Sequence, residues 1–305
     1  MMENDRPLVE ILLATYNGEK YLSELIDSLL EQSYRNILIT ISDDSSTDGT
    51  IGIIRKYKDE YPGLFRILPH TDRFGNAKDN FFFLLRNSVA DYVFLCDQDD
   101  VWLPEKVEIM IDELQRHDNE PALVHCDLEV VDNNLALINS SFVKYSHLSP
   151  ENDSIFSLTF INTVTGCASC INRKLINLCL SNLNDTSEII MHDYWLGLVA
   201  ASFGYIGYID KPLVKYRQHG DNSIGAEQYK SFEFSNKIID RKKRMLLMKK
   251  MQSSRFINLY LGFLSPKQKI FLADFSKRRS GLLFWVSHFK YIRGLKNKIG
   301  FLFLG

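Results

Sequence analysis

Residues Phe94–Pro104 have the sequence FLCDQDDVWLP, which joins an apolar segment to a strongly acidic turn. The apolar run Tyr92–Cys96 is typical of a buried β-strand. Pro104 is well placed to begin a helix, because the first helical amide needs no partner, and we expect this helix to continue through His117. A buried strand, a polar turn and a helix in this order predict one unit of a parallel sheet covered by helices.

The same alternation runs through the first 125 residues. Strands are expected at 9–14, 37–41 and 65–68, with a helix after each. Further along, we expect strands at 122–131 and 205–209, the latter ending before Pro212, a loop-rich stretch to about 157, and helices near 174–181 and 193–203. The 305 residues are therefore predicted to form an α/β domain at 1–225 and a helical region at 226–305.

Three polar segments directly follow predicted strands: Thr15-Tyr16-Asn17, Ser42–Gly49 and Asp97–Asp100. In open α/β sheets ligands bind beyond the carboxyl ends of the strands, so these segments carry most of the functional information. Carboxylates crowded this closely raise each other's pKa unless a cation or ligand donors neutralise them. Magnesium and manganese commonly bind such carboxylates together with diphosphate oxygens. The pattern predicts a nucleotide substrate.

The second of these segments has other interpretations. Asp44–Gly49 is similar to the start of an EF-hand loop, but the twelfth position is Arg55, where a glutamate is required. Ser46 or Thr47 can instead cap the next helix, with Asp48 in its first turn, and we favour this interpretation for these residues.

Helix capping does not explain Asp97–Asp100, because one cap does not need three carboxylates, and there we favour a metal. The chain lacks the Walker A, GxGxxG, HExxH and GxSxG patterns. Phosphate-loop, dinucleotide, zinc-protease and nucleophile-elbow sites therefore have no support.

Together these segments resemble family 2 glycosyltransferases, which have the GT-A fold. The matching segments are residues 11–18, 41–50 and 94–104, within a resemblance over roughly residues 8–220. The resemblance implies a nucleotide-sugar-binding α/β fold with a mixed central sheet. It implies that Asp97-Gln98-Asp99 is the DXD motif, whose last aspartate binds a divalent metal, manganese or magnesium, on the donor diphosphate. It also implies donor-binding roles for Thr15, Tyr16, Asn17, Asp44, Gly75, Lys78, Asn80 and Asp97.

The later motif Met191–Trp195, with the sequence MHDYW, is similar to the segment that carries the general base in this family. Asp193 is then the base, because a sugar hydroxyl has a very high pKa and a carboxylate must accept its proton as the new bond forms. An N-cap of its helix is the alternative for Asp193. Trp195 is a candidate to stack on a sugar face, but an aromatic residue of a helix lies more often in the core, and we favour the core for it.

Residues Tyr216–Asn222 gather an arginine, a histidine and a glycine. We expect His219 to complete the metal shell and Arg217 to clamp the diphosphate, although a histidine in a surface loop is common. The Gln-x-x-Arg-Trp motif and the transmembrane helices of the family's processive synthases are absent from the sequence. This absence argues for addition of one sugar per encounter.

Charge is distributed very unevenly along the chain. Residues 237–305 carry 17 Lys and Arg against Asp240 and Asp274, a net charge of +15, which leaves −17 for the rest. Aromatic and aliphatic residues are interleaved with the basic ones, as in amphipathic helices that lie on an anionic membrane surface. Nucleic acid is the rival partner, and packing on an acidic domain is a third explanation. We favour the membrane surface and no nucleic acid.

No apolar stretch reaches the ~18 to 20 residues that cross a bilayer. The first residues lack a basic region followed by an apolar one, so we do not expect export. Five cysteines without regular spacing indicate a reducing compartment, and the single Cys167/Cys170 pair is interpreted as coincidence. We expect a cytoplasmic protein that is peripheral at the inner face of the cell membrane.

The leading hypothesis is an inverting, metal-dependent glycosyltransferase that moves a sugar from a nucleoside diphosphate-sugar to a glycan or lipid-linked glycan acceptor in cell-surface polysaccharide synthesis. Its motifs and basic tail are similar to those of bacterial rhamnosyltransferases, so dTDP-rhamnose is a candidate donor beside the UDP-sugars. One alternative is a sugar-nucleotide nucleotidyltransferase, against which the missing Gly-rich basic first loop counts. Another is a non-catalytic membrane-bound scaffold.

Overall fold

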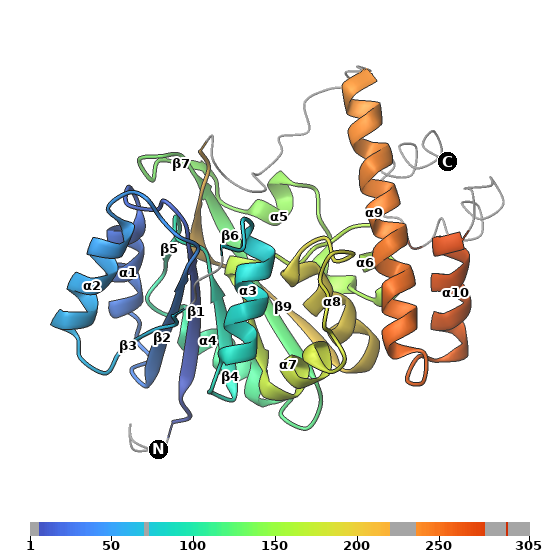
Figure 1. Ribbon diagram of the computed structural model, residues 1–305, viewed down its shortest axis with the longest axis horizontal. Helices are drawn as coiled ribbons and strands as arrows, with labels where there is room; N and C mark the ends of the chain where they lie inside the picture. Colours follow the sequence, from blue (N-terminus) through green and yellow to red (C-terminus); the bar gives the residue numbers. More distant parts are fainter. Residues whose placement is uncertain (1–5, 70–72, 220–235, 278–290, 292–305) are drawn as a thin grey trace.

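The computed structural model of the chain describes residues 6–69, 73–219, 236–277 and 291 (Figure 1). Within them lies one nine-stranded sheet of order β3-β2-β1-β4-β8-β6-β9-β5, with β7 paired to β6. The strands are β1 (Val9–Thr15), β2 (Ile37–Asp43), β3 (Phe65–Ile67), β4 (Tyr92–Cys96), β5 (Val101–Trp102), β6 (Ala122–Val131), β7 (Leu137–Asn139), β8 (Ser169–Asn172) and β9 (Tyr205–Arg217).

Helices lie on both faces of this sheet (Figure 1). They are α1 (Leu22–Leu30), α2 (Thr50–Glu60), α3 (Ala77–Asn87), α4 (Lys106–Gln115), α5 (Phe142–Tyr145), α6 (Ile155–Leu158), α7 (Arg173–Leu180), α8 (His192–Phe203), α9 (Asn236–Tyr260) and α10 (Pro266–Lys277), with 3-10 turns η2 (Pro150–Asn152) and η3 (Gly166–Ala168). One face of α1 is buried, with Leu22, Leu25, Ile26 and Leu29 fully enclosed.

The sheet is mixed, as expected. β1 pairs in parallel with β2 and β4, and β2 pairs in parallel with β3. β8 then enters antiparallel between β4 and β6, while β9 runs parallel to β6. The parallel strands β1, β2 and β4 therefore end at one common edge, which positions the polar segments that follow them.

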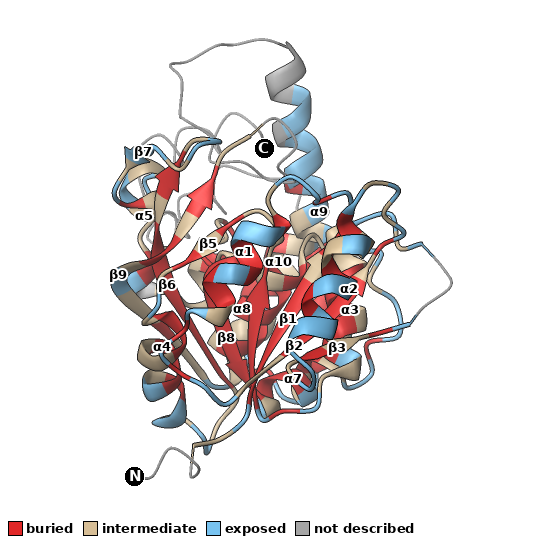
Figure 2. Ribbon diagram, turned by 90° about the vertical axis from the view of Figure 1, so that its left-hand side faces the viewer, coloured by how far each residue is buried: buried red, intermediate tan, exposed pale blue. Residues whose placement is uncertain are grey.

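Side chains that alternate along β1 enter two separate cores, because successive residues of a strand point to opposite faces. Ile11 and Leu13 pack with α1 and α4 on one face. Leu12 packs on the other face in a core that also holds Phe256 of α9 and Phe271 of α10. Figure 2 shows this red interior and the exposed upper part of α9. The helices after residue 235 thus share a core with the sheet, while the expected domain boundary near 225 lies outside the described residues.

Two parts of the expected fold are corrected. The strand predicted to end before Pro212 continues to Arg217, because Pro212 lies at an irregularity in the pairing of β6 with β9, opposite Asp127, where its missing N–H costs no ladder bond. The stretch expected to be loop-rich contains α5 and α6, each of four residues, which is too short to give a periodic pattern.

Candidate active site

The three polar segments that follow β1, β2 and β4 meet at the common edge and are joined by hydrogen bonds. The Tyr16 N–H donates to Gln98 Oε1 at 2.8 Å, and Gln98 Nε2 donates back to the Tyr16 carbonyl at 2.9 Å. The Thr15 hydroxyl donates to Asp43 at 2.7 Å. A Cβ on Gly18 would lie 2.3 Å from Gln98 Oε1, so a larger residue there would displace the Gln98 side chain from Tyr16.

Asn17 connects the first segment to the second. Its N–H donates to the Ser46 hydroxyl at 2.8 Å, and its side-chain oxygen accepts from the Thr47 N–H at 2.8 Å. Asn17 adopts a left-handed conformation with φ of 47°, a strained geometry that is common at functional sites. The expected caps Ser46 and Thr47 are not caps, since α2 has Gly49 at that position and Asp48 accepts from the Thr50 N–H.

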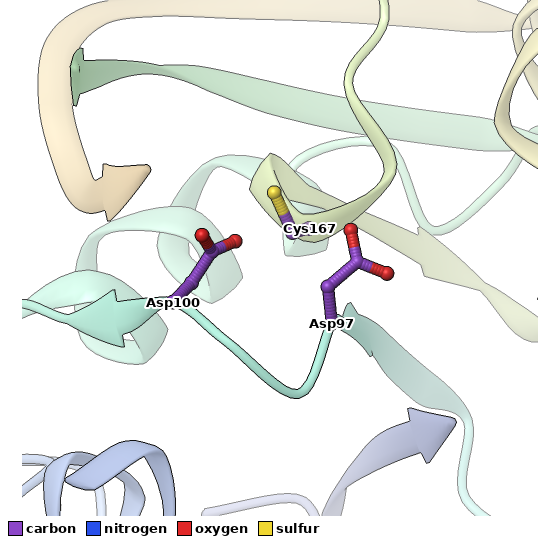
Figure 3. A group of neighbouring side chains, drawn as sticks. All are labelled: Asp97, Asp100 and Cys167. Carbon is purple, nitrogen blue, oxygen red and sulfur yellow. The ribbon is translucent and has the colours of Figure 1, made fainter. Parts of the chain in front are cut away.

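The acidic turn after β4 brings two carboxylates beneath the η3 turn (Figure 3). Asp97, Asp100 and the Cys167 thiol offer ligand atoms that all lie within 4.8 Å of one another. Asp100 is fully buried, and its Oδ1 accepts from the Arg217 N–H at 3.1 Å. Its Oδ2 is buried beside the Cys167 thiol and has no other hydrogen-bond donor in the described part of the chain.

Burial and mutual repulsion make these carboxyls weak acids. Burial, with the charges of Asp99 and Asp193, raises the pKa of Asp97 to about 7. Burial, with the charges of Asp99 and Asp97, raises the pKa of Asp100 well above its usual range. Burial also raises the pKa of the Cys167 thiol, which therefore stays protonated. This cluster holds more negative charge than its surroundings neutralise.

Asp99 and His219, the two predicted metal ligands, lie together. His219 Nε2 is 2.7 Å from Asp99 Oδ2, and the imidazole packs on the Tyr21 ring with centroids 5.2 Å apart. The end of β9 thus delivers an imidazole nitrogen to the last aspartate of the predicted DXD motif.

Arg217 does not have the role expected for it. The side chain is 1% exposed, and its Nε donates to the Asp99 carbonyl at 2.8 Å. The same guanidinium donates to Asn133 O at 2.6 Å, pairs with Glu24, and lies 4.4 Å from the centroid of the Tyr21 ring. Because protein groups surround this cation, it holds the acidic turn in place rather than reaching out to a diphosphate.

Asp193 lies in the first turn of α8, close enough to Asp97 for its charge to raise the pKa of that carboxyl. The N-cap of α8 is Met191, so capping does not explain Asp193. Asp193 Oδ1 accepts from the Tyr194 N–H at 2.6 Å. Burial raises the pKa of Asp193 to about 6, whereas hydrogen bonds from the backbone of Tyr194 and Gly166 lower it.

The residues predicted to border the donor lie on α3 and the turn before it. Asp44 accepts from the N–H groups of Phe74 at 2.5 Å and Gly75 at 2.8 Å, and Gly75 has φ of +72°. Lys78 Nζ donates to the carbonyls of Thr186 and Ile189, in the loop before α8. Asn80 is buried and donates to the Ser42 carbonyl at 3.0 Å. In this structure Lys78 and Asn80 therefore bind protein groups.

Trp195 lies in the core, the place favoured for it, and does not line a sugar site. Its ring is fully buried and packs edge-on against Phe256 of α9, with centroids 5.3 Å apart. Two residues near the acidic turn were missed, namely Cys167 and Lys106, which donates to the Cys167 carbonyl. Tertiary folding brings both to the site, and no local pattern marks them.

A mixed α/β sheet with these acidic and polar segments at one edge agrees with the class that the resemblance implies, a glycosyltransferase. Residues 10–177 match the model of the family described as "Glycosyl transferase family 2", and the chain belongs to this family. The chain is 30% identical over 263 residues to the dTDP-rhamnosyl transferase RfbG of Shigella flexneri, with 82% of this chain and 88% of that protein covered. It is 26% identical over 256 residues to the chondroitin synthase of Escherichia coli, with 83% of this chain and 35% of that protein covered.

Solved structures with this fold include the S. aureus protein TarS 1-349, with a TM-score of 0.61 at 15% identity, covering 97% of this chain and 78% of that one. The mannosyltransferase PcManGT from Pyrobaculum calidifontis, solved with GDP-Man and Mn2+, gives a TM-score of 0.55 at 18% identity. The match covers 98% of this chain and 75% of that one. At this identity the likeness concerns the fold, and it agrees with the expected GT-A architecture.

Proposed function

We propose that the protein is an inverting, metal-dependent glycosyltransferase that moves a sugar from a nucleoside diphosphate-sugar to a glycan or lipid-linked glycan acceptor in cell-surface polysaccharide synthesis. dTDP-rhamnose is the first candidate donor, since a relative that is named a dTDP-rhamnosyl transferase covers most of the chain. UDP-sugars are the second, because TarS has been solved with UDP-GlcNAc. The observation that carries the proposal is the approach of Asp193 to the acidic turn.

The residues at this edge divide the reaction between them. Asp193 accepts the proton of the acceptor hydroxyl while that oxygen bonds to the anomeric carbon. The bond from this carbon to the diphosphate breaks on the opposite face, so the configuration inverts and the diphosphate leaves with its nucleoside. Thr15, Tyr16, Asn17 and Asp44 border the nucleoside, and Asp97 borders the donor sugar.

The donor set at the acidic turn fits a divalent cation. Two groups of donors lie at this turn: Asp97 and Asp100 beside the Cys167 thiol, and Asp99 beside His219. Their carboxylate oxygens and the imidazole nitrogen suit manganese or magnesium. Burial raises the pKa of Asp97 and of Asp100, and the charges of the neighbouring aspartates raise both further. When bound, the cation would neutralise the departing diphosphate. Asp99 and His219, which are in contact, would hold it. The Mn2+ bound in PcManGT supports the use of a divalent metal.

A screen of nucleotide sugars with the purified chain and Mn2+ tests this function. We expect dTDP-rhamnose to be consumed faster than UDP-, GDP- and CMP-sugars, with dTDP released and sugar transferred to a lipid-linked acceptor from the source cells. Release of pyrophosphate from a nucleoside triphosphate would indicate a nucleotidyltransferase instead. Nucleotide binding without turnover of any donor would indicate a non-catalytic scaffold.

We further propose that the protein binds the anionic inner face of the cell membrane through α9. Seven of the thirteen large hydrophobic side chains that are exposed in the described residues lie in or directly after α9 and in α10: Met245, Leu247, Met248, Met251, Leu261, Phe263 and Ile270. In α9, Arg244, Leu247, Met248 and Met251 share one face, opposite the buried Phe256 and Tyr260. Basic and apolar groups on one face suit an interfacial helix. None of the helices described here is long and apolar enough to span a bilayer.

Vesicle binding is expected to depend on this face. The triple variant Arg244→Gln, Leu247→Ser, Met251→Ser should bind vesicles with one-third phosphatidylglycerol about tenfold or more weakly than the wild type, since each basic residue near an anionic surface contributes about 1 kcal/mol. Raising the salt from 0.1 to 0.5 M should weaken wild-type binding too. The control Leu137→Ser, Ile138→Ser removes exposed apolar groups from β7 and should bind normally. Equal binding by the triple variant, measured by co-sedimentation, contradicts the proposal.

A further inference from the structure

Lys106 is a fully buried lysine behind the acidic turn. It is the first residue of α4 and is 0% exposed. Its Nζ donates to the Cys167 carbonyl at 2.6 Å and lies 3.1 Å from the centroid of the Trp102 ring. The thiols of Cys96, Cys126 and Cys167 and the carboxylate of Asp100 are its other electrostatic neighbours.

Stability does not explain a charge in this place. Taking an ammonium out of water costs several kcal/mol, and a well-packed apolar side chain of similar volume is often neutral or stabilising there. The cation–π contact with Trp102 and one hydrogen bond offset part of this cost. The charge of Lys106 instead favours the ionised form of Asp97, so its electrostatic effect reaches the acidic turn.

The carbonyl that Lys106 binds belongs to η3, and η3 connects the two halves of the site. The Cys167 side chain lies against Asp97 and Asp100 on the side of the donor. Gly166, one residue earlier, hydrogen-bonds Asp193 through its backbone. A Cβ on Gly166 would lie 3.6 Å from the Asp193 Cβ and 3.0 Å from His192 Nε2, so η3 packs directly on the start of α8.

We infer that Lys106 is a positioning residue for sugar transfer: by holding the Cys167 carbonyl, its ammonium fixes η3 between the acidic turn and Asp193. The distance between the acidic turn, where the diphosphate is expected, and Asp193 then depends on the buried ammonium of Lys106. The inference rests on the proposed function, in which Asp193 is the base. A displacement of about 1 Å of a reacting group can cost about 10²-fold in rate, so a group that contacts neither substrate can still limit kcat.

Lys106→Met removes the charge and the donor while it keeps the length of the side chain. We expect kcat to fall about tenfold or more with the donor KM within about threefold of wild type, because the segments that border the nucleoside follow β1 and β2, whereas Lys106 binds η3. Hydrogen exchange of residues 166–168 should speed up about tenfold, reflecting the loss of one charge-assisted bond. Thermal stability should be unchanged or higher.

Two further variants separate positioning from general damage. Ile111→Val alters the buried face of the same helix away from η3, and should lower stability but leave kcat unchanged. Lys106→Arg keeps a cation and a donor, and should recover most of the kcat lost in Lys106→Met. If the Met variant does not fold, Lys106→Gln, which also removes the charge, replaces it in the kcat and exchange measurements. Full kcat in folded Lys106→Met, a rise in donor KM alone, or an equal kcat loss in Ile111→Val overturns the inference. Hydrogen exchange at residues 166–168 can be measured even if the protein turns over no donor. A failure of the proposed function is therefore distinguished from a failure of the positioning role of Lys106.

Discussion

Replacing Asp193 by Asn is expected to reduce kcat for sugar transfer by about 10²- to 10⁴-fold, the range that general-base catalysis supplies. The amide has nearly the same shape as the carboxyl but cannot accept the proton of the acceptor hydroxyl. Donor binding should change little, since the donor segments follow β1, β2 and β4 rather than α8. The measurement is steady-state transfer with a saturating donor, together with nucleotide affinity by calorimetry.

The pH dependence of kcat should identify the same group. Burial raises the pKa of Asp193 to about 6, and the base acts only when it is ionised, so kcat should fall about tenfold per pH unit below that value. The titratable neighbours of Asp193 are the Asp97 carboxyl, whose pKa is raised to about 7 by burial and nearby charges, and the adjacent His192, whose pKa burial lowers to about 3. In Asp193→Asn the residual rate should lose this acidic limb.

Asp193→Asn should lower activity but keep or raise the stability of the fold. Because the folded-state pKa of Asp193 is raised, ionisation of the carboxyl destabilises the fold as the pH rises from about 4 to above 6. Asp193→Asn removes this cost, so at pH 7 its melting temperature should be equal or higher. An exposed control, Asp185→Asn, should change neither quantity. A variant that keeps more than a tenth of wild-type kcat would exclude Asp193 as the base.

Local patterns in the sequence were enough to predict the first half of the fold. In β1, α1 and β2 hydrophobic periodicity and turn residues act over short distances, and the observed bounds differ from the predicted ones by a few residues. The antiparallel entry of β8 between β4 and β6 could not be predicted from the residues alone. Its four residues acquire their place from strands that lie far away in the sequence.

The candidate site also contains residues that the sequence could predict and residues that it could not. Residues that directly follow strands, such as Asp97 and Asn17, were found because parallel strands bring their carboxyl ends together. The roles of Arg217 and Lys106 could not be predicted from the sequence. A cation near a nucleotide site is expected to bind phosphate, and only the burial of these two side chains shows that their partners are protein groups. Trp195 had a readable signal, because α8 is apolar on nearly all sides and such a helix lies in a core.

Metal dependence is expected to follow Asp99. Asp99→Asn should raise the Mn2+ concentration for half-maximal activity by about 100-fold or more, because losing even a group that only orients a ligand costs about 10- to 100-fold. The carboxylate contacts His219 at 2.7 Å, so the variant removes the charge but leaves the imidazole beside an amide. Treating the wild type with EDTA should abolish transfer, and added Mn2+ or Mg2+ should restore it.

Binding of the metal can be followed without any donor. A ligand that binds only the folded state at 100 times its dissociation constant adds about 2.7 kcal/mol to the free energy of unfolding, so saturating Mn2+ should raise the wild-type melting temperature. The shift should be lost in Asp99→Asn and kept in Asp91→Asn, which changes an exposed carboxylate at the opposite end of β4. Turnover that survives EDTA, or an unchanged Mn2+ requirement in Asp99→Asn, would remove the metal from this turn. The raised pKa of Asp97 would then describe a proton shared among carboxylates, and departure of the diphosphate would need another source of positive charge.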